Sequence, residues 1–151
     1  MKESGVHALL VTKGGEILLV KKGSDYQYDA KNAGKVALFG GGMEVGEDMF
    51  VALKRELSEE LELDIENLEV KPLETYAKTL AMDGVDVEVH VFVVSGVDRG
   101  LLVLREGDAM IDGVAHDANR EIIEGSADEL LARSDITRIT RLALQDFIKN
   151  Q

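Results

Sequence analysis

The segment of residues 47–61 constrains the fold of this chain more than any other stretch. Four apolar residues recur there at i, i+3, i+7 and i+11: Phe50, Leu53, Leu57 and Leu61. At 100° per residue they fall on one stripe, which predicts an amphipathic α-helix with these four side chains in the core. Such a helix must bury its stripe against another layer of secondary structure.

The same predicted helix carries glutamates in positions that do not favour its stability. Glu56, Glu59 and Glu60 share one flank beside the apolar stripe, at spacings of three and four residues. Like charges at these spacings destabilise a helix by about 0.2–0.5 kcal/mol per pair, and anions near the C-terminal end oppose the helix dipole. A run of glutamates is commonly a solvated face. The alternative interpretation is a platform for a hard divalent cation, because Mg²⁺ prefers oxygen ligands.

Residues 40–42, which precede this helix, are all glycine. Glycine lets the backbone come close to a ligand and can turn a carbonyl group towards a metal ion. A glycine-rich loop followed by a helix with an acidic flank therefore favours a site for a metal ion and a diphosphate group.

The whole segment of residues 41–63 resembles the signature of the Nudix family. That signature is a glycine, five residues, glutamate, seven residues, Arg-Glu, an aliphatic residue, any residue, Glu-Glu, any residue, glycine and an aliphatic residue. The matching positions are Gly41, Glu47, Arg55, Glu56, Leu57, Glu59, Glu60 and Leu63.

Two positions depart from the family pattern. Phe39 stands where many members have proline before the paired glycines, and Glu62 stands where the signature has glycine. Glycine at the end of a helix adopts the left-handed conformation easily, whereas glutamate does not. The helix is therefore expected to continue to Asp64 or to end in a different way.

The resemblance implies an α/β/α sandwich with a mixed β-sheet, and hydrolysis of a phosphoanhydride bond in a nucleoside diphosphate derivative. Two substrate branches stay open: nucleoside triphosphates, including oxidised nucleotides, and ADP-ribose or nucleotide sugars. A non-catalytic nucleotide-binding module is an alternative, disfavoured because every acidic residue of the signature is present. A diphosphate isomerase is another, disfavoured because the chain has no cysteine.

The resemblance also implies a metal site. Glu56, Glu59 and Glu60 are expected to bind Mg²⁺ or Mn²⁺ together with the backbone carbonyl of Gly40. Either Glu56 or Glu59 is expected to act as general base.

Three further residues of the segment are expected to support this site. Arg55 would orient a glutamate through a bidentate bond without touching the metal ion, because its planar guanidinium matches a carboxylate. Glu47 would lie near the glycine-rich loop, of which Gly41 is a part.

Four residues outside the segment are weaker candidates. Some family members use a carboxylate outside the signature as general base, and Glu106 and Asp108 are the candidates for that role. Tyr26 or Tyr28 would stack on a nucleobase. The ordinary alternatives are loop acids and partly buried tyrosines. The three histidines show no metal-ligand spacing and are interpreted as structural or surface residues.

The rest of the chain predicts several strands and two more helices. The expected strands are residues 6–11, 17–20, 36–39, 68–80, 85–94, 101–104 and 121–123. Gly14-Gly15 and Asp83-Gly84 are two-residue hairpin signals, and residues 21–35 are a long loop. The expected helices are residues 127–132 and a C-terminal helix marked by Ile136, Ile139, Leu142, Ala143 and Phe147. Alternating valines in residues 85–93 predict a strand face packed inward.

Length and charge limit the function further. A chain of 151 residues favours one domain spanning residues 1–151. A net charge of −12 disfavours a nucleic acid polymer as partner, and it would also repel a phosphorylated small molecule unless a metal ion neutralises the charge locally. No apolar run is long enough for a membrane span or typical of a signal peptide. A cytoplasmic location is therefore expected. A homodimer, frequent in the family, stays open.

Overall fold

The fold is built around one mixed β-sheet. The computed structural model describes residues 3–23, 34–73, 78–82, 85–105, 110–111, 114–115 and 120–150. The eight-stranded sheet has the order β10-β2-β1-β7-β5, with β3 paired to β2, β4 to β1 and β6 to β7. Its strands are β1 (Glu3–Thr12), β2 (Ile17–Lys21), β3 (Val36–Ala37), β4 (Phe39–Gly42), β5 (Glu69–Pro72), β6 (Lys78–Met82), β7 (Val85–Val97) and β10 (Glu121–Gly125). Among these described strands, β1 and β7 are parallel and the other pairs are antiparallel. The short strands β8 (Met110–Ile111) and β9 (Val114–Ala115) pair separately.

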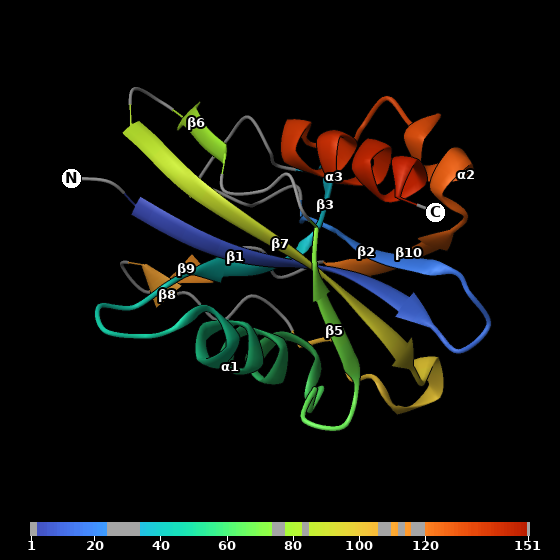
Figure 1. The fold of residues 1–151 in the computed structure, drawn as a ribbon, viewed down its shortest axis with the longest axis horizontal. Helices are drawn as coiled ribbons and strands as arrows, with labels where there is room; N and C mark the ends of the chain where they lie inside the picture. The colour runs from blue at the N-terminus through green and yellow to red at the C-terminus, as the bar shows by residue number, and fades with distance from the viewer. Residues whose placement is uncertain are drawn as a thin grey trace.

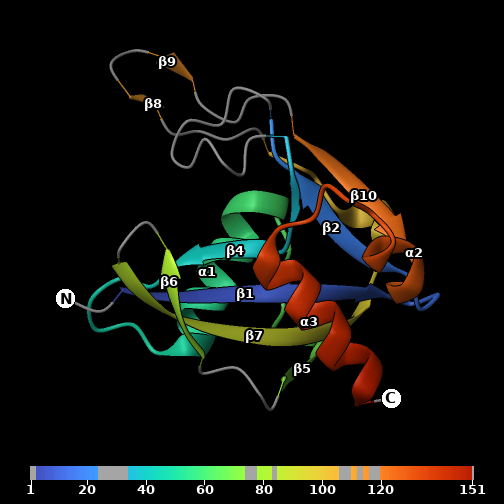
Figure 2. The same cartoon turned by 90° about the horizontal axis from the view of Figure 1, so that it is seen from above.

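Helices cover both faces of the large sheet. α1 (Met49–Leu61) lies on one face, and α2 (Ala127–Leu131) and α3 (Arg138–Lys149) lie on the other (Figure 1 and Figure 2). Successive residues of β1 point to opposite faces of the sheet. Ala8 therefore belongs to the hydrophobic cluster under α1, with Leu57, and Leu9 to the cluster under α3, with Leu144. The architecture is the expected α/β/α sandwich with a mixed sheet.

α1 starts two residues later than the sequence suggested. The Asp48 carboxylate accepts a hydrogen bond from the Val51 N–H at 2.9 Å and caps the helix, so Met49 is its first residue. Leu53, Leu57 and Leu61 are buried as expected, and Ala52 joins them. The expectation that Phe50 lies in the core was wrong. Phe50 is 41% exposed, because it belongs to the first turn, ahead of the buried part of the stripe.

Glu62 ends α1 in the conformation that glycine usually adopts. It has φ 53° and ψ 29°, and its N–H donates to the Ser58 carbonyl at 3.0 Å. The Leu63 N–H donates back to the Leu57 carbonyl at 3.3 Å, as in a glycine-terminated helix. The helix does not continue to Asp64. The substitution of glycine by glutamate therefore leaves the shape of the helix end intact.

β1 and β2 form the expected hairpin, but its loop has three residues instead of two. The Thr12 N–H donates to the Glu16 carbonyl at 2.9 Å, and the Gly15 N–H donates to the Thr12 carbonyl at 3.0 Å. Gly15 has φ +92°. A glycine with positive φ at the last loop position is the usual way to close a three-residue hairpin.

The expected strand at residues 36–39 is divided into β3 and β4. The Leu38 N–H leaves the ladder and donates to the buried Thr140 hydroxyl of α3 at 3.1 Å. β4 then extends through the glycines of residues 40–42, which pair with β1 instead of forming a loop.

Two other strand predictions needed correction. The stretch of residues 68–80 forms β5 and β6 instead of one long strand, and both pair with β7. Residues 101–104 are not a strand. A 3₁₀ turn, η2 (Arg99–Leu101), forms there because the Asp98 carboxylate accepts the Gly100 N–H at 3.0 Å.

β7 runs through the middle of the sheet and is covered on both faces. Val89 and Val91 are buried on the α3 side, as their alternation predicted, while Val94 is buried on the α1 side. No helix in the described ranges is both long and apolar enough to cross a membrane.

Candidate functional site

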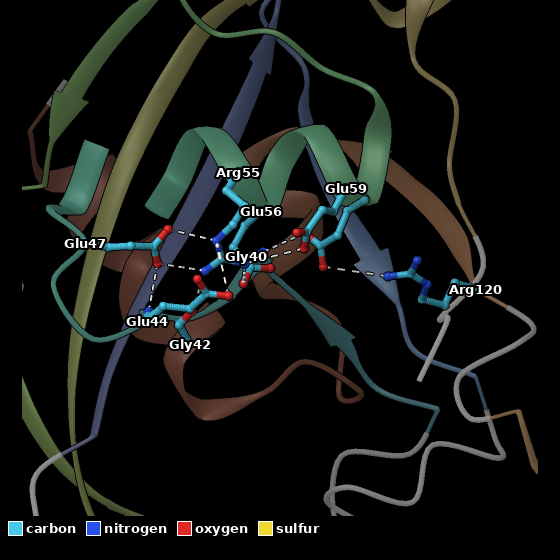
Figure 3. A network of polar contacts seen from close by, with 9 residues as sticks. Gly40, Gly42, Glu44, Glu47, Arg55, Glu56, Glu59 and Arg120 are labelled. Atoms are coloured by element: carbon cyan, nitrogen blue, oxygen red, sulfur yellow. Dashed lines mark hydrogen bonds and ion pairs between the residues drawn. The ribbon is translucent and has the colours of Figure 1, made fainter. Parts of the chain in front are cut away.

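The acidic flank of α1 and the glycines of β4 lie directly against each other (Figure 3). β4 pairs with β1 so that Gly40 faces His7 and Gly41 faces Val6. The Gly40 N–H donates to Oε2 of Glu60 at 2.9 Å. A helix side chain is thus bonded to the backbone of a strand in the layer below it.

Gly40 and Gly41 are required by close approaches of other atoms. Gly40 has φ +136°, and a Cβ there would lie 2.1 Å from the carbonyl oxygen of Val6. A Cβ at Gly41 would lie 2.7 Å from a carboxylate oxygen of Glu56. Without side chains at these two positions, the backbone leaves room for the glutamates of α1.

Arg55 connects the helix with the loop that precedes it. Its guanidinium makes two bonds to Glu47, from Nε to Oε2 and from Nη2 to Oε1, both at 2.9 Å. Nη2 also donates to the Gly42 carbonyl at 3.0 Å. Nη1 donates to Glu56 at 3.1 Å and to Glu59 at 3.5 Å. Arg55 therefore forms its bidentate pair with Glu47 and single bonds with the other two glutamates.

The carboxylates of the site differ strongly in their acidity. Hydrogen bonds from Arg55 and from the Glu44 N–H lower the pKa of Glu47 to about 2. Burial, with repulsion from Glu56, raises the pKa of Glu60 to about 7. Burial also raises the pKa of Glu56, against the opposing effect of Arg55. The flank of α1 thus holds carboxylates whose negative charge the surrounding protein does not fully compensate.

Two basic residues beside Glu60 were not found by sequence reasoning. Arg120 places Nη1 3.7 Å from Oε1 of Glu60, and the two side chains are only 6% and 13% exposed. Lys22 lowers the pKa of Glu60 through its charge. The antiparallel pairing of Glu121 with Lys21 makes Lys22 and Arg120 register neighbours. Both lie outside residues 41–63, and nothing in the sequence distinguishes them from other basic residues.

The oxygen donors of this site fit a hard divalent cation. Within the described ranges, no three acidic or histidine side chains are already arranged around one point. Mg²⁺ usually takes only one or two carboxylates, and waters and substrate phosphates complete its shell. Glu56 and Glu60 supply such carboxylates, and a cation would neutralise their crowded charge.

The remaining predicted residues are placed as follows. Glu59 lies at the exposed end of the flank, with its side chain 57% exposed. The structure brings this residue together with Gly40, Gly41, Glu47, Arg55, Glu56 and Glu60. The tentative candidates Tyr26, Tyr28, Glu106 and Asp108 lie outside the described residues.

Comparison with known proteins agrees with this architecture. The family model for the NUDIX domain matches residues 1–129. A search of curated proteins gives no match. Among solved structures, a MutT protein from Methanosarcina mazei Go1 has a TM-score of 0.75 at 19% identity, covering 99% of this chain and 94% of that one. A MutT NUDIX hydrolase from Burkholderia pseudomallei has a TM-score of 0.71 at 25% identity, covering 97% and 98%.

A third similar structure is named for its substrate. The E. coli dihydroneopterin triphosphate pyrophosphohydrolase has a TM-score of 0.69 at 14% identity, covering 98% of this chain and 96% of that one. Nudix hydrolases generally use divalent metal ions and act on small nucleotide substrates. Because the family model covers most of the chain and the fold agrees over nearly its whole length, this protein belongs to the Nudix family.

Proposed function

We propose that this protein is a pyrophosphohydrolase that cleaves a phosphoanhydride bond in a nucleoside diphosphate derivative with the help of Mg²⁺ or Mn²⁺. The observation that carries the proposal is the convergence of two carboxylates, Glu56 and Glu60, on the bare backbone of Gly40 and Gly41. Membership of the Nudix family supplies the general reaction class.

Glu56, Glu59 and Glu60 are the proposed metal ligands, together with the carbonyl oxygen of Gly40. A bound divalent ion would neutralise the diphosphate and activate a water molecule for in-line attack on phosphorus. Neutralisation is needed here because a chain with a net charge of −12 repels a phosphorylated substrate. The raised pKa values of Glu56 and Glu60 support this role, because partial burial without a cation disfavours their ionised forms.

Arg55 is proposed to position the site without contacting the metal ion. Its bidentate bond to Glu47 fixes the guanidinium, and its single bonds to Glu56 and Glu59 set the direction of both carboxylates. Its bond to the Gly42 carbonyl ties the end of β4 to the same group. Glu47 therefore acts as the anchor of the arginine.

The general base is proposed to be Glu56 or Glu59. Glu59 is exposed and makes a long 3.5 Å bond to Arg55, so its carboxylate is accessible to water. Glu56 is closer to the glycine backbone and is partly buried. A carboxylate outside the signature, Glu106 or Asp108, is the other candidate for this role.

The proposed unit is the whole chain, residues 1–151, as one domain. Both hydrophobic clusters lie on the same sheet, one under α1 and the other under α3. The C-terminal helix α3, which follows the residues matched by the family model, therefore contributes to the same fold.

The substrate branch is tested by the products. Purified protein would be incubated with Mg²⁺, or with chelator, against nucleoside triphosphates, oxidised nucleotides, ADP-ribose, nucleotide sugars and dinucleoside polyphosphates, and products identified by mass. Triphosphate hydrolysis gives pyrophosphate and a monophosphate, whereas ADP-ribose gives two monophosphates. At least one metal-dependent hydrolysis is expected. No hydrolysis of any compound, with Mg²⁺ binding intact, would contradict the proposal and favour a nucleotide-binding module.

A further inference from the structure

The two oxygens of the Glu60 carboxylate face different partners, a backbone N–H of β4 and the guanidinium of Arg120. Oε2 accepts the Gly40 N–H at 2.9 Å, and Oε1 faces Nη1 of Arg120 at 3.7 Å. Both side chains are nearly inaccessible to solvent, so water competes little with this ion pair. One backbone group and one arginine therefore face the two carboxylate oxygens directly, and Lys22 adds a favourable charge nearby.

Arg120 is itself fixed relative to the end of α1. Its Nη2 donates to the carbonyl oxygen of Arg105. The Arg105 N–H in turn donates to the carbonyl oxygen of Glu60 at 2.9 Å, and the Val103 N–H donates to that of Leu61 at 3.1 Å. The segment of residues 103–105 thus satisfies the last carbonyls of the helix, which have no partner within it, and also binds the arginine.

These contacts form a closed ring through three residues. The ring runs from the Glu60 carboxylate to the Arg120 guanidinium, to the Arg105 backbone and back to the Glu60 carbonyl oxygen. Turning the carboxylate away from Gly40 would stretch the ion pair while the ring holds the guanidinium in place. This arrangement restricts the side chain of Glu60 more than the bond to Gly40 alone would.

Arg120 and Arg55 serve different carboxylates. Figure 3 shows the two guanidinium groups on opposite sides of the acidic flank of α1. Arg55 bonds to Glu56 and Glu59, whereas Arg120 faces Glu60. Arg55 is part of residues 41–63, but Arg120 reaches the site from the position just before β10.

We propose that Arg120 is a positioning residue that orients Glu60 for metal binding. It acts through Glu60 and contacts neither the metal ion nor the substrate. This inference rests on the proposed function, in which Glu60 is a metal ligand. Groups that orient metal ligands from outside the coordination shell typically contribute 10–100-fold to metal affinity.

The test measures binding of Mn²⁺ alone to the full chain, by electron paramagnetic resonance and calorimetry, without substrate. Arg120→Met keeps the apolar stem and removes the guanidinium, and Arg120→Gln keeps a hydrogen-bond donor without the charge. Both variants are expected to weaken Mn²⁺ binding about 10-fold or more. Arg120→Lys is expected to recover part of the loss, because it restores a cation beside Oε1 of Glu60.

Arg105→Met is the matched control. Arg105 pairs with Glu62 at 2.5 Å through an exposed side chain, whereas its part in the ring uses only backbone groups. This variant is therefore expected to leave Mn²⁺ affinity unchanged. Melting temperatures without metal identify any variant that does not fold, and the inference is then judged on the folded one.

Two results would overturn the inference. One is Mn²⁺ binding by a folded uncharged variant that is as tight as in the wild type, or tighter. The other is an equal loss of affinity in Arg105→Met, which would indicate a general effect of the segment of residues 103–105. Failure of the wild type to bind Mn²⁺ is a distinct result, because it contradicts the proposed function on which the inference rests.

Discussion

Glu47 and Glu60 belong to one site, but their surroundings shift their pKa values in opposite directions. Glu47 receives the Arg55 guanidinium and a backbone N–H, so its pKa is about 2 and it is ionised at any physiological pH. Glu60 is buried, and its pKa is about 7 without a metal ion. The first carboxylate therefore serves as a fixed anchor, and the second becomes fully ionised at neutral pH only when a cation compensates its charge.

Glu60→Gln is expected to stabilise the metal-free protein at pH 8 by up to about 3 kcal/mol. The folded-state pKa of Glu60 lies above its ordinary value of 4.5, so its favourable contribution is complete below pH 4.5 and is lost as the pH rises through 7. At pH 4.5 no gain is expected. Denaturant unfolding of the wild type and the variant at pH 8 and pH 4.5 measures this difference in the free energy of unfolding. Turnover is expected to fall by orders of magnitude. Glu62→Gln, an exposed substitution at the same end of α1, is the control and should change neither the stability nor the turnover. A Glu60→Gln variant with reduced stability at pH 8 and normal turnover would contradict the assignment of Glu60 as a metal ligand.

Metal binding is expected to release a proton from Glu60. At pH 6 this carboxyl is mostly protonated in the metal-free protein, because its pKa is about 7, and a metal ligand must be ionised. Calorimetric titration with Mg²⁺ in buffers of different ionisation enthalpy should therefore show close to one proton released at pH 6 and almost none at pH 9. The affinity for Mg²⁺ should rise from pH 6 to pH 9, because less protonated Glu60 remains to compete with the metal ion. A release that does not depend on pH would contradict the role of Glu60 as a ligand.

β4 and α1 form the site as a pair of elements. β4 ends in glycines that lie under the helix, and the two glycines closest to the glutamates are constrained by different neighbours. At Gly40 the obstacle is the rigid backbone of β1, whereas at Gly41 it is the far end of the Glu56 side chain. These two positions should therefore respond differently to the same substitution.

Gly40→Ala is expected to lower the free energy of unfolding by roughly 2–4 kcal/mol, because its Cβ would collide with the Val6 carbonyl at positive φ. Gly41→Ala should fold normally, because the Glu56 carboxylate can move away from the new methyl group. Its Mg²⁺ affinity and turnover should fall instead. Thermal unfolding and metal titration of both variants distinguish these effects. Equal loss of stability in the two variants would argue against the contact between Gly41 and Glu56.

The end of α1 offers a test of helix termination. Glu62 adopts a left-handed conformation that glycine tolerates at lower cost, and its ion pair with Arg105 is exposed and therefore weak. Glu62→Gly is expected to raise the free energy of unfolding by about 0.5–1 kcal/mol. Glu62→Ala removes the same ion pair but keeps a Cβ, so it should give no gain. A destabilised glycine variant would show that the ion pair with Arg105 outweighs the backbone strain.

For the molecule as a whole, local sequence patterns predicted most elements and missed those decided by distant contacts. Hydrophobic periodicity predicted α1 apart from its first turn, because Leu53, Leu57 and Leu61 are buried against the sheet. The break at Leu38 depends on Thr140, which is 102 residues away. The approach of Arg120 to Glu60 depends on the pairing of β2 with β10. No pattern within residues 41–63 contains this information.

The distribution of charge also belongs to the whole molecule. The chain carries a net charge of −12, yet Arg55, Arg120 and Lys22 gather around the acidic flank of α1. Arg55 lies in α1, Arg120 just before β10 and Lys22 just after β2, and only the folded sheet brings them together. Their charges compensate the carboxylates partly, and the remaining negative charge favours a bound cation.

The most direct measurement is the rate of phosphoanhydride hydrolysis of the best substrate with Mg²⁺, with chelator, and with Mg²⁺ in the Glu59→Gln variant. Hydrolysis that requires Mg²⁺ is expected. The variant should lose turnover by orders of magnitude while keeping its melting temperature, because removing one of several crowded carboxylates relieves repulsion. Full activity in chelator would contradict a metal-dependent mechanism, and unchanged turnover in Glu59→Gln with a lower melting temperature would show that this glutamate serves only the fold.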